Sequence, residues 1–319
     1  AHMSVSKMAT TLLLFVASAT ALGRTRAPPI RINSIISSRP ISCTSRSDFR
    51  RVVPPRLHAS QHQVSSPVPR ILGLEELLHS SDATVEIQGQ VLFDAIRAEA
   101  IECAHSPVIG PWVNRTVLSA KDLPDAMARI LASHVAGAAG SMFVEGAVQE
   151  LLCAVSAESR QVRRGVVTDL TKAIEADFAV ESLLQPFLHF KGLHVVSLSR
   201  IASKLWRMGG NANKHTALAL QSHGSMTYGV DIHPMAKLGE GIFVDHATGL
   251  VIGSTAIVGN DVMILHGVTL GATGKRVEGK RHPTVGDGTV LGALSTVLGD
   301  VSIGRKATVG AQAVVTKNV

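Results

Sequence analysis

Three short motifs in the C-terminal third of the chain contain side chains that could carry out acid–base chemistry. They are Asp231-Ile232-His233-Pro234, Asp245-His246-Ala247-Thr248-Gly249 and Arg281-His282-Pro283. An imidazole next to a carboxylate is a candidate general base, because the carboxylate can fix its tautomer and stabilise the imidazolium ion. A lone histidine can instead be a surface or corner residue held by a backbone hydrogen bond. The pairing of His246 with Asp245 favours the catalytic interpretation.

A six-residue period surrounds these motifs and predicts the elements that position them. An aliphatic residue recurs at every sixth position and is usually followed by glycine. This pattern is typical of a parallel β-helix, in which each hexapeptide forms a short strand and a turn, and three units make one coil. The aliphatic positions are Ile232, Leu238 and Val244 in a first phase, and then Ile252, Val258, Ile264, Leu270, Val285, Leu291, Val297, Ile303, Val309 and Val315.

Two irregularities in the period coincide with the polar motifs. The phase slips by two residues around Asp245–Leu250, and Gly274–Pro283 interrupts the repeat and must loop out. Loops on such a solenoid commonly carry function. We expect Asp231 and Asp245 to lie on neighbouring faces of the prism, and we expect His266 within a strand.

The chain before the repeats has the 3.6-residue periodicity of helices. A helix is predicted from Val91 onwards, and further amphipathic stretches follow at about 122–139, 142–157, 159–176 and 186–207. Asp122, Ser159 and Pro186 stand where helices are expected to start. We therefore predict a presequence and linker at 1–70, an all-α domain at 71–225 and a β-helix at 226–319.

The charge of the chain is distributed unevenly. Its 319 residues carry a formal net charge of +7, and the sequence pI is about 9.6. Residues 1–70 account for +9 and the remainder for −2, so the basic pI does not indicate nucleic-acid binding. No apolar run reaches the ~20 residues of a membrane helix. Three scattered cysteines, Cys43, Cys103 and Cys153, predict reduced thiols. We expect no nucleic-acid partner and no membrane.

The first seventy residues have the composition of a targeting segment. An apolar stretch at Thr11–Leu22 contains the small-x-small motif Ala19-Thr20-Ala21, and the following residues to about 66 are rich in Arg, Ser and Pro. A signal-like segment followed by a transit-like segment is typical of the bipartite presequences of some algal plastids. We expect the plastid (chloroplast) stroma as the location; a mitochondrial address and secretion are the alternatives.

Four segments resemble the signature of serine O-acetyltransferases. They are VDIHPMAKLGEGIFVDHATG (Val230–Gly249), VTLGATGK (Val268–Lys275), RHP (Arg281–Pro283) and, in the helical part, DFAVESLLQPFLHFKGLH (Asp177–His194). The resemblance covers about residues 90–319. It implies an all-α helical domain followed by a left-handed parallel β-helix of hexapeptide repeats. It also implies transfer of the acetyl group of acetyl-CoA to the hydroxyl of L-serine, which gives O-acetyl-L-serine for cysteine biosynthesis.

The resemblance implies a role for each motif residue. The catalytic base would be His246, oriented by Asp231, and the acetyl group would pass directly to serine without an acyl-enzyme and without a metal. A base is required because the weakly acidic serine hydroxyl must lose its proton as it attacks the thioester. Carboxylates suit the substrate ammonium group and arginine suits its carboxylate. The substrate-binding residues implied are Asp177, Asp245, Arg281 and His282.

Acetyl-CoA is expected to lie along the groove of the solenoid. The residues implied are Ala272, Gly274, Lys275 and Ala293. Lys275 would contact a phosphate, with a solvated loop lysine as the alternative. We expect the positive charges of Lys275, Arg276, Lys280 and Arg281 to face a carboxylate and an anionic co-substrate.

Departures from the family pattern concern regulation and partners. Ser254 stands where the family usually has the glutamate of GETA, so a carboxylate that could orient His282 is missing. This affects the expected role of His282 and the expected feedback inhibition by L-cysteine. The sequence ends at Val319, ahead of the family's C-terminal tail. We therefore expect weakened CoA binding, and no stable complex with O-acetylserine sulfhydrylase unless the native chain is longer.

The sequence also leads to expectations about the oligomeric state and about alternative functions. The resemblance implies a homotrimer or a dimer of trimers. The rivals are another hexapeptide acyltransferase, a non-catalytic scaffold, and a metalloenzyme of the γ-carbonic-anhydrase type with a zinc site made by His246, His266 and His282. The helical domain with Asp177 and the intact DHATG motif favour the serine acetyltransferase.

Overall fold

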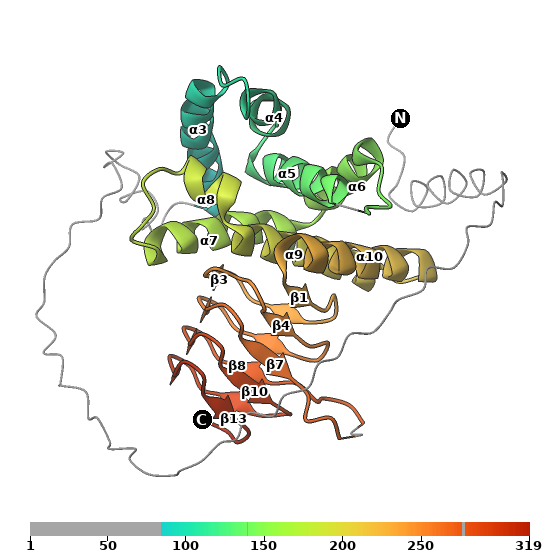
Figure 1. Ribbon diagram of the computed structural model, residues 1–319, viewed down its shortest axis with the longest axis vertical. Helices are drawn as coiled ribbons and strands as arrows, with labels where there is room; N and C mark the ends of the chain where they lie inside the picture. The colour runs from blue at the N-terminus through green and yellow to red at the C-terminus, as the bar shows by residue number, and fades with distance from the viewer. Residues whose placement is uncertain (1–83, 139, 276–277) are drawn as a thin grey trace, which may run out of the picture.

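The computed structural model describes residues 84–138, 140–275 and 278–319. A layer of helices lies across one end of a three-sided prism of parallel strands (Figure 1). The predicted fold class, an all-α domain followed by a left-handed parallel β-helix of hexapeptide repeats, is confirmed. The predicted presequence at 1–70, Cys43 and Arg276 lie outside the described residues.

The helical layer starts with α3 and ends with α10. Two predicted N-caps are confirmed: the Asp122 carboxylate accepts a hydrogen bond from Asp125 N at 2.9 Å, and Ser159 Oγ accepts one from Val162 N at 3.3 Å. The helix predicted from Val91 begins earlier, at Val85. The helices are α3 (Val85–Cys103), α4 (Gly110–Val113), the π-helix η1 (Asn114–Leu118), α5 (Leu123–Gly137), α6 (Glu145–Glu158), α7 (Arg160–Ala176), α8 (Leu184–His189), α9 (Lys191–Met208) and α10 (Asn211–Tyr228).

The single helix predicted at 186–207 is wrong, because this stretch belongs to two helices. Pro186 lies inside α8, and the chain turns at Phe190, whose ψ is 98°, before α9 begins. The first turn of α8 is capped by a distant residue. The carboxylate of Glu99 in α3 accepts hydrogen bonds from Leu183 N at 3.1 Å and Leu184 N at 2.7 Å. Contact with α3 therefore decides where α8 starts.

The prism is built from three parallel sheets. Sheet A has the order β1-β4-β7-β10-β13, sheet B β2-β5-β8-β11 and sheet C β3-β6-β9-β12. The strands are β1 (Asp231–Ile232), β2 (Lys237–Leu238), β3 (Phe243–Val244), β4 (Val251–Ile252), β5 (Ile257–Val258), β6 (Met263–Ile264), β7 (Thr269–Gly271), β8 (Thr284–Val285), β9 (Val290–Leu291), β10 (Thr296–Leu298), β11 (Ser302–Ile303), β12 (Thr308–Val309) and β13 (Val314–Val315).

The predicted aliphatic positions stack on one another in register. In sheet A, Ile232 pairs with Ile252, Ile252 with Leu270, Leu270 with Val297, and Val297 with Val315. The first four of these side chains are buried inside the prism. Because each strand buries one aliphatic side chain, the six-residue period is visible in the sequence.

Both irregularities of the repeat occur at turns. The two-residue slip forms a widened turn in which His246 and Ala247 have φ of 56° and 57°, and the residues between β7 and β8 form the predicted loop. One expectation is wrong: His266 lies in the turn after β6 and not in a strand. In this turn the ring of His266 lies next to that of His246.

Polar contacts join the helical layer to the first coil. Arg200 of α9 donates two hydrogen bonds of 2.9 Å to Asp169 of α7, and its Nη2 also donates to Gly239 O at 2.6 Å. Asp169 in turn accepts a hydrogen bond from Ile242 N at 2.8 Å. Both side chains of this pair are buried. The pair therefore fixes two helices against the same turn of the solenoid, and neither charge is left uncompensated.

In the described part of the chain, no helix is long and apolar enough to cross a membrane.

Candidate active site

The turns between the sheets form three corners, which we name by the sheets that they join. In corner CA, backbone hydrogen bonds of 2.9 Å run from Gly267 N to Thr248 O and from Leu294 N to His266 O. Corner CA contains Asp245–Thr248, Leu265–Gly267 and Gly292–Leu294; corner AB contains His233–Met235, Gly253–Thr255 and the loop 272–283; corner BC contains Glu240–Gly241, Asn260–Asp261 and Asp287–Gly288.

His246 projects from the first turn of corner CA. Its side chain is 76% exposed, and its Nε2 lies 3.7 Å from Asp245 Oδ1, within ion-pair range but longer than a hydrogen bond. The ring of His266 lies beneath it in an edge arrangement, with 6.0 Å between ring centroids. His266 Nδ1 is buried and has no hydrogen-bond partner among the described residues. The exposed imidazole of His246 is thus accessible to a ligand.

Asp231 lies in the strand next to the widened turn. It is the first residue of β1, and its backbone N–H donates to Leu250 O at 2.9 Å, directly after the widened turn. Its carboxylate accepts a hydrogen bond of 2.5 Å from Gln221 Nε2 of α10. The structure therefore places Asp245 and His246 at corner CA and Asp231 in the adjoining strand of sheet A, on the neighbouring face, as expected from their spacing. Ala293 lies further along the same stack of turns.

The helical layer braces corner CA. Gly192, in the first turn of α9, packs so closely that a Cβ would lie 2.0 Å from Val244 O, and Lys191 Nζ donates a hydrogen bond to Thr248 Oγ1. Asp177 directly follows α7, which also packs against β3. One oxygen of the Asp177 carboxylate accepts a hydrogen bond from Ala179 N at 2.9 Å.

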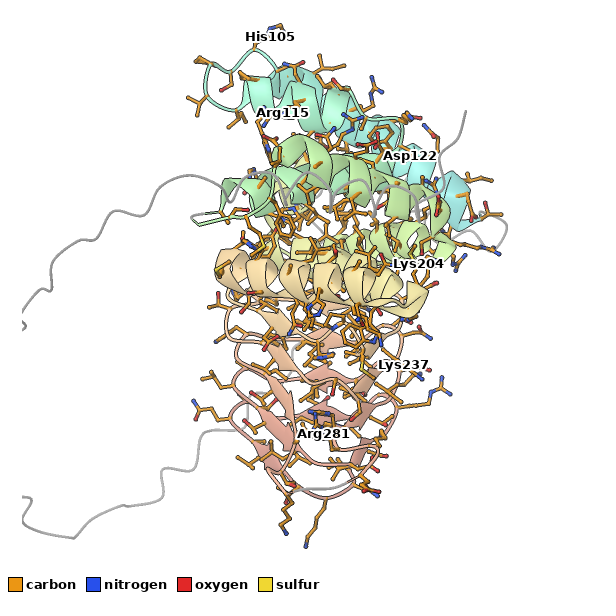
Figure 2. All side chains as sticks on the ribbon, turned by 90° about the vertical axis from the view of Figure 1, so that its right-hand side faces the viewer. His105, Arg115, Asp122, Lys204, Lys237 and Arg281 are labelled. Atoms are coloured by element: carbon orange, nitrogen blue, oxygen red, sulfur yellow. The ribbon has the colours of Figure 1, made fainter. Side chains whose placement is uncertain are left out.

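Corner AB holds the second group of predicted residues. His282 is buried, and Figure 2 shows Arg281 on the side of the prism, below the helical layer. Ala272, Gly274 and Lys275 lie in the same loop. Lys280 Nζ contacts Asp300 Oδ1 and Thr284 Oγ1, both at 2.6 Å. Lys280 is therefore paired with Asp300, and its predicted contact with a ligand stays a prediction.

The two histidines of corner AB have lowered pKa values. Burial and the neighbouring Arg281 and His233 lower the pKa of His282. Burial also lowers the pKa of His233, assisted by Arg281 and opposed by Asp231. Both imidazoles therefore favour the neutral form more strongly than a free histidine does.

Strand β4 separates the two corners within one chain. His246 precedes β4, and Thr255, which binds His282, follows it. Strand β4 comprises Val251–Ile252 and runs along sheet A from corner CA to corner AB. The predicted site residues of a single chain therefore form two separate groups.

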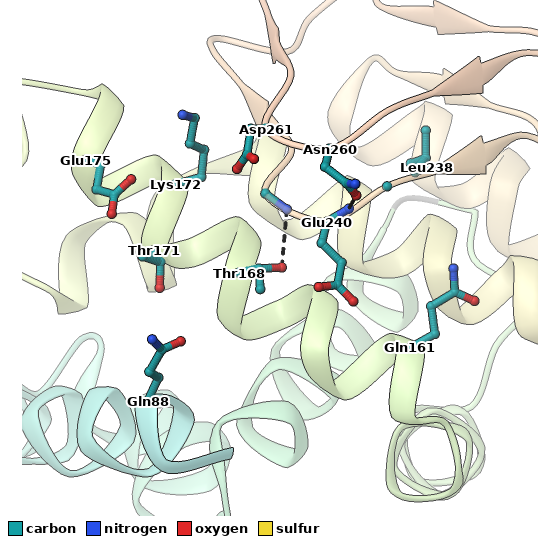
Figure 3. A pocket seen from close by; sticks show the side chains of 12 residues that line it. Gln88, Gln161, Thr168, Thr171, Lys172, Glu175, Leu238, Glu240, Asn260 and Asp261 are labelled. Carbon is teal, nitrogen blue, oxygen red and sulfur yellow. Dashed lines mark hydrogen bonds between the residues drawn. The ribbon is translucent and has the colours of Figure 1, made fainter. Parts of the chain in front are cut away.

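A groove of about 700 Å³ lies elsewhere, at corner BC. Figure 3 shows it between α3, α7 and the first turns of the solenoid, with the hydrogen bond from Gly241 N to Thr168 Oγ1 on its wall. Beside it, Arg164 donates two hydrogen bonds of 2.9 Å to Glu240. None of the residues predicted for catalysis or binding lines this groove.

The structure does not bring together the three histidines of the rival zinc site within one chain. His246 and His266 share corner CA, and His282 lies at corner AB. In the described ranges, no group of three His, Cys, Asp or Glu side chains is arranged to hold a metal ion.

Sequence reasoning missed three residues that support the site. Gln221 binds Asp231, Lys191 binds Thr248, and Thr255 binds His282. Thr255 had a signal in the sequence, because it follows Ser254 at the departure from the family motif. Gln221 and Lys191 lie on helices, and nothing in their sequence context links them to the turns that they contact.

Comparison with known proteins identifies the family. Residues 92–197 match the model of the serine acetyltransferase N-terminal domain, and residues 282–317 match the bacterial transferase hexapeptide model. "Serine acetyltransferase 4" of Arabidopsis thaliana is 36% identical over 272 residues, which are 85% of this chain and 71% of the relative. The chain belongs to the serine acetyltransferase family. It is an acyltransferase.

Solved structures of the family agree with this membership. The Neisseria gonorrhoeae serine acetyltransferase in complex with serine matches with a TM-score of 0.66 and 38% identity, over 72% of this chain and 91% of that one. A serine acetyltransferase in complex with cysteine matches with a TM-score of 0.67 and 36% identity, over 72% of this chain and 87% of that one. The acyltransferase fold described above is therefore that of enzymes that bind these two amino acids.

Proposed function

We propose that this acyltransferase moves the acetyl group of acetyl-CoA directly to the hydroxyl of L-serine, with His246 as the general base. The serine Oγ attacks the thioester carbonyl while His246 takes its proton. A bond forms between Oγ and the carbonyl carbon, and the bond from that carbon to the CoA sulfur breaks. His246 then returns the proton to the CoA thiolate, so the products are O-acetyl-L-serine and CoA.

One observation carries this proposal: an exposed imidazole beside the Asp245 carboxylate at a corner that the helical layer braces. His246 has Asp245 at 3.7 Å, and Asp231 begins the strand next to the widened turn. An imidazole exchanges protons near neutral pH more readily than other side chains do. Asp231 is held by Gln221 in the strand next to the widened turn; we propose that its carboxylate orients the imidazole when substrate is bound.

Recognition of serine uses groups from both corners. Asp177 and Asp245 match its ammonium group, and Arg281 with His282 matches its carboxylate. Corner CA and corner AB of one chain lie at opposite ends of β4 and on different edges of the prism, so we infer that one small amino acid does not touch both. We therefore place each site between corner CA of one protomer and corner AB of the next. Such a head-to-tail contact closes as a homotrimer, and two trimers could pair further into a hexamer.

The same division applies to acetyl-CoA. Ala272, Gly274 and Lys275 belong to corner AB, and Ala293 belongs to corner CA. A groove between two protomers would bring these residues to one co-substrate. In that arrangement Lys275 faces its phosphates.

L-cysteine is proposed as an inhibitor at the serine site. It has the same ammonium and carboxylate groups as serine, so Asp177, Asp245 and Arg281 would bind it in the same way. A related enzyme has been solved in complex with cysteine. Competition between cysteine and serine in the acetylation assay tests this proposal.

Residues 1–70 are proposed to be a plastid presequence. Their composition supports this address: +9 of formal charge with a single acid, Asp48. A fluorescent protein fused after residue 70 should accumulate in plastids; accumulation in mitochondria would contradict the proposal.

The catalytic proposal is tested by serine-dependent release of CoA thiol from acetyl-CoA. We expect His246→Ala to lose at least about 100-fold in kcat, the usual contribution of a general base, while the variant keeps its helical and thermal signatures. Activity that survives this substitution would refute the role of His246. Strict dependence on added zinc would refute the metal-free mechanism.

A further inference from the structure

Thr255 forms a closed set of hydrogen bonds with the end of the corner AB loop. Its Oγ1 accepts hydrogen bonds from Arg281 N at 3.0 Å and from His282 N at 3.1 Å. The same Oγ1 lies 2.8 Å from His282 Nδ1, and Thr255 N donates to that nitrogen at 3.2 Å. One residue thus fixes the backbone and the ring of His282 together.

The donors and acceptors in this set allow only one tautomer of the neutral ring. A backbone N–H can only donate, so His282 Nδ1 must accept and carries no proton. Thr255 Oγ1 already accepts from two backbone N–H groups, so its own hydrogen is free to point at Nδ1. The ring proton is therefore on Nε2, which has no hydrogen-bond partner among the described residues.

The ring is also held in place by packing. His282 lies over Gly253, where a Cβ would come within 2.1 Å of its Cδ2 and Nε2 atoms. Ser254, between Gly253 and Thr255, stands where the family usually has a glutamate. The charged or titratable groups that act on His282 are Arg281 and His233, and both oppose a positive charge on its ring.

We infer that Thr255 is a positioning residue that holds His282 neutral with its proton on Nε2, so that His282 donates a hydrogen bond to a substrate oxygen and does not serve as a second base. The role toward substrate rests on the proposed function, whereas the tautomer does not. In this chain the hydroxyl and the backbone N–H of Thr255 thus orient the His282 ring, a role that a carboxylate could also fill. A carboxylate partner would accept from Nδ1–H and stabilise an imidazolium; Thr255 does neither.

The tautomer can be measured without any assumption about the reaction. The wild-type oligomer is labelled with ¹⁵N-histidine, and long-range ¹H–¹⁵N spectra are recorded between pH 6 and 8. The His282 signals are assigned by their loss in His282→Gln. We expect an unprotonated Nδ1 and a protonated Nε2 across this range. A protonated Nδ1, or a doubly protonated ring at pH 7, would overturn the inference.

A kinetic test uses substitutions of Thr255 with a neighbouring control. Thr255→Val keeps the shape and removes the hydroxyl, so we expect kcat/KM for serine to fall about tenfold or more, the effect of losing one or two hydrogen bonds. Thr255→Ser restores the hydroxyl and should remain within about threefold of the wild type. Ser254→Ala changes the adjacent side chain, which takes no part in these hydrogen bonds, and should behave as the wild type.

The pH profile separates positioning from a general structural role. In the wild type we expect one ionisation, that of the base, on the acid limb of kcat/KM. In Thr255→Val the ring nitrogen Nδ1 loses the hydroxyl donor and keeps only the backbone N–H at 3.2 Å, so protonation of the ring is opposed less strongly and a second ionisation should appear. Equal losses in Thr255→Ser and Thr255→Val, or a wild-type profile in Thr255→Val, would refute the inference. If instead His246→Ala kept full activity with the expected His282 tautomer, the proposed function would fail and the tautomer assignment would stand.

Discussion

Mixing two inactive variants tests whether the site is shared between protomers. His246→Ala removes the base at corner CA, and Arg281→Ala removes the guanidinium at corner AB. Each variant alone should be nearly inactive, because every site in its oligomer lacks one group. The two corners lie at opposite ends of β4 in one chain, so mixed oligomers can contain sites that join the two intact corners.

The size of the recovery follows from this geometry. A protomer with the Arg281 substitution still has an intact corner CA, and a protomer with the His246 substitution still has an intact corner AB. A site is therefore intact only where the first kind supplies corner CA and the second kind supplies corner AB. With random assembly at equal amounts each condition holds half of the time, so about one quarter of all sites are restored. In isolated mixed trimers, each of which contains one such junction, about one third of the sites are restored. If a single chain formed the site, no site would be restored.

The assay needs mixed oligomers and a matched control. The two variants are co-expressed with different affinity tags, mixed oligomers are isolated through both tags, and CoA release is measured per protomer. A pair of variants altered at the same corner, His246→Ala with His246→Asn, should show no recovery. An absence of recovery in verified mixed oligomers of the first pair would refute the shared site.

Two further predictions concern the stability of the fold. Asp169→Ala leaves Arg200 buried without its carboxylate and should reduce the free energy of unfolding by about 3–5 kcal/mol. As a control, Glu240→Gln breaks the half-exposed pair with Arg164 and should reduce it by about 1 kcal/mol or less. Equal losses for the two variants in urea unfolding would contradict this reasoning. Burial, with the neighbouring His134, lowers the pKa of His194 from 6.5 to about 3, so the unfolded chain binds a proton there that the folded chain does not. Stability should therefore fall as the pH decreases from about 6.5 towards 3, and His194→Gln should reduce that slope by about one proton.

The repeat architecture could be predicted from the sequence because its cause is local and periodic. Each strand buries one aliphatic side chain, so the register Ile232–Ile252–Leu270 was already visible as a spacing. The helix starts at Asp122 and Ser159 were predictable for the same reason, since a capping side chain binds a backbone N–H three residues away.

Features that depend on contacts between distant segments could not be predicted. The start of α8 is decided by the Glu99 carboxylate of α3, and the junction of helices and solenoid by the buried pair of Asp169 and Arg200. In the sequence, these are ordinary charged residues on helices. His266 was assigned to a strand because the period alone does not show where each turn begins.

The sequence by itself determined the fold class, the family and the residue types available for chemistry, because periodic burial and motif identity are properties of consecutive residues. Only the tertiary structure decided how those residues are distributed in space. It placed His246 with Asp245 at one corner, Asp231 in strand β1 beside Gln221, and Arg281 with His282 at another corner, since a coil of the prism turns the chain through three faces before it returns. It also revealed Thr255 as the partner of His282, because side chains on successive coils meet only when the coils stack.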